Sequence, residues 1–107
     1  MNFNEYQVLA RRTQNAELSR EDMLNHALRG LASECGEING IYQKALQGHE
    51  VDREHVAEEL GDLLWFCAEL ADSIGVQLGS VANSNIVKLM ARYPDGFDAD
   101  RSVNRDE

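Results

Sequence analysis

The chain has 107 residues, of which 43% are hydrophobic and 27% are charged, which is enough for one folded domain and too few for two. Its formal net charge of −9 argues against binding DNA or RNA through the phosphate backbone, because that mode needs a basic surface. No apolar run is long enough to cross a bilayer, and the first residues lack the basic and apolar stretches of a signal peptide. We therefore expect a cytoplasmic protein that binds neither nucleic acid nor membranes.

The hydrophobic pattern predicts helices, since no long run alternates apolar and polar residues. The predicted helices cover residues 4–14, 20–48, 53–73 and 78–93, with Ser19 and Asp52 as N-caps and Gly75 and Pro94 as stops. The sequence thus predicts one all-α domain over residues 1–107, resembling a four-helix bundle. Its helical core spans about residues 3–93, and a polar tail at 95–107 is extended or partly disordered.

The apolar faces of the predicted helices indicate what each one buries. The first helix turns Tyr6, Leu9 and Ala10 inward, with Val8 as a further candidate. The second carries one apolar arc that includes the following residues: Leu24, Ala27, Leu28, Leu31, Cys35, Ile38, Ile41, Tyr42, Ala45 and Leu46. Cys35 and Cys67 both lie on such arcs, so we expect reduced cysteines in the core.

The third helix carries apolar residues on a second side as well, namely Trp65, Phe66 and Ala68. A helix that is apolar on two sides is usually covered on two sides, which favours a homo-oligomer, a homodimer or homotetramer. Two alternatives stay open: Trp65 packs under the tail or the first helix, or, less favoured, it stacks on a nucleobase.

Two short acidic motifs stand out, Glu34-Cys35-Gly36-Glu37 and Glu59-Leu60-Gly61-Asp62. Acids three apart on a helix point to the same side, so two such helices can bring four carboxylates into one pocket. Glu34 falls inside an apolar arc, where an unpaired charge costs several kcal/mol. Oxygen-only ligands suit Mg²⁺, with Mn²⁺ as a substitute. The plainer interpretation is that these acids pair with Arg or Lys or line a solvated rim.

The fourth predicted helix carries Asn85, Lys88 and Arg92 on one polar stripe. An amide and two cations can bind phosphate oxygens, and Lys44 near the end of the second helix is a further candidate for substrate binding. A solvated helix face explains such a stripe equally well in isolation.

A di-iron carboxylate protein is disfavoured, because those sites use a Glu-x-x-His motif. Met23, Leu46 and Asp52 stand three residues before His26, His49 and His55, so the motif is absent. We expect these histidines to face solvent or to cap local structure. A helical interaction module without enzymatic activity is a second rival; it predicts no metal-dependent turnover.

The acidic motifs, together with NIVKLMARYPDGF at residues 85–97, resemble the MazG-like nucleotide pyrophosphohydrolases of the all-α NTP pyrophosphatase group. The likeness covers about residues 3–97. It implies that Glu34, Glu37, Glu59 and Asp62 are catalytic and bind Mg²⁺. It also implies that Asn85, Lys88 and Arg92 contact a nucleoside triphosphate, which is hydrolysed to the monophosphate and pyrophosphate, as in nucleotide-pool house-cleaning.

Ser33 departs from the family pattern, since it stands where the EExxE motif has its first glutamate. If the family's first glutamate helps to position water, that role is in doubt here. The departure keeps a third rival open, a catalytically weak nucleotide-binding or regulatory helical module.

Overall fold

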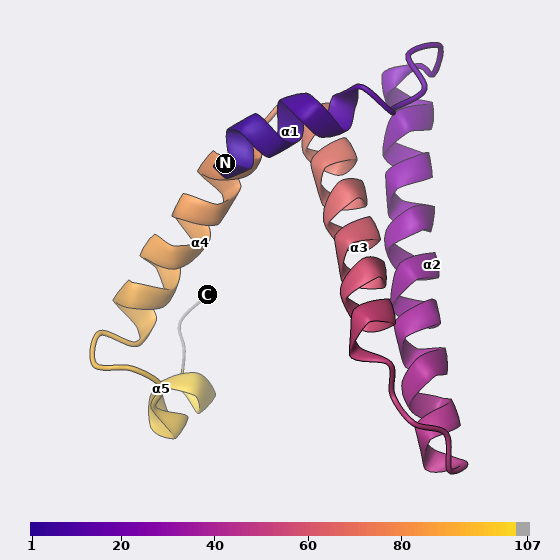
Figure 1. The fold of residues 1–107 in the computed structure, drawn as a ribbon. Coiled ribbons are helices and arrows are strands. Elements are labelled where there is room, and N and C mark those ends of the chain that lie inside the picture. Colours follow the sequence, from indigo (N-terminus) through magenta and orange to yellow (C-terminus); the bar gives the residue numbers. More distant parts are fainter. Residues whose placement is uncertain (105–107) are drawn as a thin grey trace.

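The computed structural model describes residues 1–104, most of which lie in five helices (Figure 1). These are α1 (Phe3–Arg11), α2 (Arg20–Leu46), α3 (Arg53–Ser73), α4 (Leu78–Arg92) and α5 (Ala99–Val103). The described residues form no strand, so the all-α prediction is confirmed.

Within residues 1–104, the helices are too short or too polar to cross a membrane.

The ends of the two long helices follow from local hydrogen bonding. The Ser19 hydroxyl accepts from the backbone N–H of Asp22 at 3.1 Å, and α2 begins at the next residue. The Asp52 carboxylate accepts from the N–H of Glu54 at 3.0 Å, which starts α3. Gly75 has a φ of 73°, in the left-handed region that favours glycine, so α3 ends just before it.

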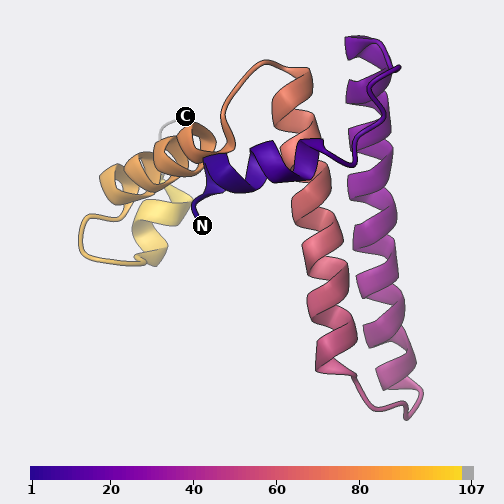
Figure 2. The same cartoon turned by 45° about the horizontal axis from the view of Figure 1, so that its top comes forward.

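The two long helices α2 and α3 run antiparallel and side by side (Figures 1 and 2). Gly30 lets them approach closely, because the Phe66 ring occupies the space where a Cβ at position 30 would lie. Gly30 is itself buried in the middle of α2. This contact sets the spacing between the helices within about one turn of the acidic motifs.

Replacing Gly30 with alanine should therefore lower the free energy of unfolding by about 1–3 kcal/mol, because Phe66 must leave its position. Gly40 is the matched control on the same helix, since a Cβ there meets open space. Gly40→Ala should be stabilising by about 0.5–1 kcal/mol through helix propensity. Chemical denaturation of both variants measures the difference, and equal effects would contradict the proposed contact.

The small core lies where α1 crosses the upper part of α3. It contains Ala10, Ala68, Ala71 and Leu78, with Tyr6, Leu64, Trp65 and Cys67 packed against it. The inward placement of Tyr6 and Ala10 is confirmed. The inward placement of Leu9 and Val8 is wrong, because a short helix crossing one neighbour covers only one narrow side, and both residues are exposed.

A polar network that was not predicted from the sequence also fixes α1. Asp72 accepts hydrogen bonds from Gln7 at 2.9 Å, from Arg11 at 2.7 Å and from Gln14 at 2.8 Å. These bonds hold the pKa of Asp72 below its usual value against the opposing effect of burial. Gln7 is buried and also accepts from the N–H of Leu78 at 2.7 Å, so α1 determines where α4 begins.

From that junction α4 diverges from the α2–α3 pair (Figures 1 and 2). The four predicted helices are present as α1 to α4, but they do not close into a bundle within one chain. The radius of gyration is 17.0 Å, whereas a compact domain of 100 residues has about 13 Å. Within residues 1–104, α4 is held near its start, where Leu78 and Gly79 meet α1 and the end of α3 lies close by.

Several apolar residues are consequently exposed. On α4 they are Val81, Ile86, Val87 and Met90. Part of the apolar arc expected on α2 is also uncovered, namely Leu28, Tyr42 and Leu46, and Cys35 is exposed rather than in the core. Apolar patches of this kind mark surfaces that another molecule covers.

Trp65, in contrast, is accommodated within the chain. Its indole N–H donates to the Thr13 hydroxyl at 2.8 Å, and its ring packs against the core below α1. The alternative in which Trp65 packs under the first helix is therefore the right one. The case for a second subunit rests on α4 instead.

The tail prediction is wrong in part, because Ala99–Val103 form the short helix α5. The Asp98 carboxylate caps it by accepting from the N–H of Asp100 at 2.9 Å. Ahead of it, the rings of Tyr93 and Phe97 lie 5.6 Å apart. Residues 105–107, at the end of the predicted tail, lie outside the described residues.

Candidate metal centre

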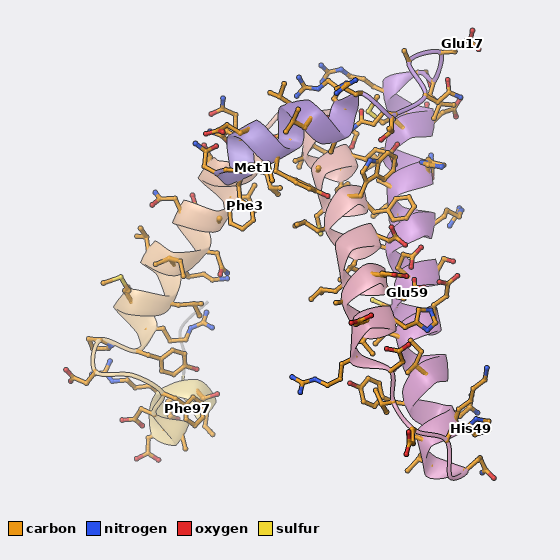
Figure 3. All side chains as sticks on the ribbon, viewed as in Figure 1. Met1, Phe3, Glu17, His49, Glu59 and Phe97 are labelled. Atoms are coloured by element: carbon orange, nitrogen blue, oxygen red, sulfur yellow. The ribbon has the colours of Figure 1, made fainter. Side chains whose placement is uncertain are left out.

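The acidic motifs meet where α2 packs against α3, and Glu59 is labelled there in Figure 3. One carboxylate oxygen from each of Glu34, Glu59 and Asp62 lies within 4.8 Å of the other two. Glu37, one turn beyond Glu34 and exposed, interacts with Glu59. The structure thus brings the four predicted acids together from two helices.

The crowding of these acids changes their protonation. The pKa of Glu34 is raised to about 7, first by a hydrogen bond with Glu59, then by burial and by the neighbouring negative charges. The pKa of Glu37 is also raised, chiefly by its hydrogen bond with Glu59. Glu59 has a lowered pKa, because Glu34 and Glu37 and then His55 are hydrogen-bonded to its carboxylate. Without a cation, Glu34 therefore holds its proton up to about neutral pH.

Two buried oxygen atoms support a cation at this place. The Oε2 atoms of Glu34 and Glu59 are shielded from solvent and have no hydrogen-bond partner within residues 1–104. Buried acceptors are normally satisfied, so each needs a ligand. His55 Nε2 lies 3.2 Å from Oε1 of Glu59, so it does not satisfy the buried Oε2 of the same carboxylate. The oxygen-only donor set fits Mg²⁺ or Mn²⁺.

The other predicted site residues lie elsewhere on the molecule. Lys44 is exposed in the last turn of α2, two turns beyond Glu37. Asn85 and Lys88 are exposed on α4 and line a hollow of about 430 Å³ with Val76, Ser80, Val81 and Ser84. Arg92 lies at the end of α4, with its guanidinium 6.0 Å from the centre of the Tyr93 ring. Within one chain, α4 diverges from the α2–α3 pair that carries the acids (Figure 1).

The acids themselves lie on an open helix face. A cavity of about 630 Å³ is bounded by α1 and the beginning of α2, near Asp72, and none of the four acids lines it. Ser33 is exposed beside Glu34. Within one chain, the acidic cluster is therefore exposed on one side and is separate from the cationic residues on α4 that the sequence predicts to bind substrate.

A second pair of polar residues, between the same two helices α2 and α3, was not predicted from the sequence. His26 on α2 lies with Nδ1 2.7 Å from Oε1 of Glu69 on α3, and Glu69 is completely buried. The expectation that His26 faces solvent holds for about half of its side chain, which is 52% exposed. The available signal was the position of Glu69, seven residues after Asp62 and so on the same side of α3.

Comparison with known proteins agrees with this geometry. The model of the MazG nucleotide pyrophosphohydrolase domain matches residues 23–97, which include all four acids and the stripe on α4. The chain is 32% identical over 87 residues to the Gene 37 protein of Mycobacterium phage L5, covering 77% of this chain and 76% of that protein. No solved structure matches. The chain belongs to the MazG nucleotide pyrophosphohydrolase family.

Proposed function

We propose that this chain is a Mg²⁺-dependent enzyme that hydrolyses nucleoside triphosphates to the monophosphate and pyrophosphate, in the house-cleaning of nucleotide pools. The observation that carries the proposal is the convergence of Glu34, Glu59 and Asp62, with two buried oxygen atoms that lack partners. These three acids and Glu37 would hold the ion. When bound, Mg²⁺ supplies positive charge to the phosphate oxygens and lowers the pKa of water.

The side chains of the protein have two tasks in this reaction. Glu34 and Glu37 must release the protons that their raised pKa values favour, since only carboxylates hold the ion. Of the four acids, the exposed Glu37 is the best placed to accept the proton of the attacking water once it is ionised.

The cations that bind the phosphates would come from a second copy of the chain, as a homodimer or a pair of dimers. Asn85, Lys88 and Arg92 lie on α4, which diverges from the α2–α3 pair of its own chain (Figure 1). The same helix exposes Val81, Ile86, Val87 and Met90, which need cover. An acidic face on one copy and a cationic helix on the other are complementary in charge.

A product assay tests the proposal. The purified protein is incubated with ribo- and deoxynucleoside triphosphates in Mg²⁺ or in EDTA, and the products are separated by ion exchange. We expect monophosphate and pyrophosphate with Mg²⁺ and neither product with EDTA. If the products were instead the nucleoside diphosphate and phosphate, the proposed cleavage between the α and β phosphates would be wrong.

A nucleotide sensor is the second candidate, favoured by Ser33 in place of the family glutamate. It predicts that nucleotides raise the melting temperature in Mg²⁺ without any product. The same assay, combined with thermal melts, separates the two functions.

A further inference from the structure

Glu69 is a buried carboxylate outside the metal centre. Its side chain has no exposed surface, and its Oε1 pairs with Nδ1 of His26 at 2.7 Å. Its Oε2 is also buried and has no hydrogen-bond partner in the part of the chain that the structure describes. A buried acceptor without a donor is costly and calls for an explanation.

The position of Glu69 relates it to the proposed substrate. It follows Asp62 by seven residues, so it lies about 10 Å further along α3 and about 20° around its axis. Phe66 lies between the two on the helix, with its ring against Gly30. Glu69 thus belongs to the same α2–α3 seam as the acids, on the side toward α1, where the nucleoside of a metal-bound triphosphate can lie.

The surroundings of Glu69 are aromatic. The ring centre of His26 lies 5.7 Å from that of Phe66 and 6.5 Å from that of Trp65. Trp65 and Phe66 meet edge to face at 5.1 Å. His26 is therefore a flat heteroaromatic ring that packs near two aromatic rings and lies at hydrogen-bonding distance from a buried carboxylate. A nucleobase offers the same combination of a flat ring and N–H donors.

We propose that Glu69 recognises the nucleobase of the substrate and that this base is guanine, which takes the place of the His26 ring. The inference rests on the proposed function. Guanine has two adjacent donors, N1–H and the 2-amino group, which match Oε1 and the unpartnered Oε2 of Glu69. Adenine and cytosine have a ring nitrogen acceptor beside their amino group, and uracil has a carbonyl oxygen on each side of its N–H. In each of these bases an acceptor would face a carboxylate oxygen, and the two would repel each other.

Access to Glu69 requires His26 to move. About half of the His26 side chain is exposed to solvent, at 52%. Rotation of His26 away from Glu69 is therefore the step that must bring the base within reach of the carboxylate. The histidine thus satisfies Glu69 in part while no base is bound.

The first experiment compares kcat/KM for GTP and ITP in Mg²⁺, with ATP and UTP alongside. ITP lacks only the 2-amino group. We expect GTP to exceed ITP by about 10- to 100-fold, the effect of one hydrogen bond to a charged acceptor. Turnover of all four nucleotides at similar rates would overturn the inference and leave the proposed function intact. No turnover of any nucleotide would refute both.

The second experiment uses Glu69→Gln, which keeps the shape and replaces one acceptor by a donor. A glutamine amide pairs with the N1 acceptor and 6-amino donor of adenine. We expect the ratio of ATP to GTP turnover to rise about tenfold or more. A purely structural role for Glu69 predicts an equal fall for every base, and that result would overturn the inference.

Glu58→Gln is the matched control, because Glu58 is an exposed acid on the same helix. It removes the same charge and should leave all base ratios unchanged. Circular dichroism melts establish that each variant is folded. If Glu69→Gln does not fold, the ratio of GTP to ITP in the unchanged protein decides.

Discussion

Glu34→Gln and Asp62→Asn should each lower Mg²⁺-dependent turnover by on the order of 100-fold or more while the fold persists. Each change removes one carboxylate from a cluster whose oxygens lie within 4.8 Å of one another. The metal-free variants should melt at or above the temperature of the unchanged protein, since repulsion is relieved. Mg²⁺ should raise the melting temperature of the unchanged protein, and it should raise that of the variants by much less.

The dependence of this stability on pH follows from Glu34. Its pKa is about 7 in the folded chain, above its ordinary value of 4.5, so the folded chain binds this proton more tightly than the unfolded chain. The resulting stabilisation is complete below pH 4.5 and is lost as the pH rises to about 7. In EDTA, the melting temperature of the unchanged protein should fall across that range, and that of Glu34→Gln should fall less.

The exposed Glu58 again provides the control. Glu58→Gln should retain turnover, the response to Mg²⁺ and the pH profile. Variants of Glu34 and Asp62 that melt like the unchanged protein with and without Mg²⁺ would rule out a four-carboxylate metal centre.

Mixing two inactive variants should restore activity if α4 acts on a second copy. Asp62→Asn disables the acids, and Lys88→Ala disables the cationic helix. When equal amounts are unfolded and refolded together, half of the dimers combine one chain of each kind. Each mixed dimer then contains one intact site, so the mixture should regain about a quarter of the unchanged activity. The product assay measures the turnover of each variant alone and of the refolded mixture.

A second mixture serves as the reference. Glu34→Gln and Asp62→Asn both disable the acidic half, so their mixture should stay inactive. If the first mixture also stays inactive although mixed dimers are present by size and mass, Lys88 acts on the acids of its own chain.

The helices and the four acids could be predicted from the sequence because both depend on short-range rules. Ser19, Asp52 and Gly75 mark helix ends through bonds to residues two to four positions away. Glu34 and Glu37 share a side of α2 for the same reason, as Glu59 and Asp62 share a side of α3.

The open shape could not be predicted in this way, because it depends on contacts between distant residues. Gln7 joins Asp72 and Leu78, which lie 65 and 71 residues away, and nothing in their local sequence pairs them. Glu69 was missed for a similar reason, since its partner His26 lies 43 residues away. A lone glutamate at helical spacing resembles an ordinary surface residue until the neighbouring helix is in place.

If α4 acts on a second copy as proposed, its uncovered side makes catalytic output depend on the amount of protein. A chain whose apolar helix and cationic stripe need a second copy is inactive when dilute, because association follows mass action. Near the dissociation constant, doubling the concentration of chains more than doubles the concentration of paired chains. A small rise in synthesis would then produce a disproportionate rise in nucleotide hydrolysis, without any separate regulator.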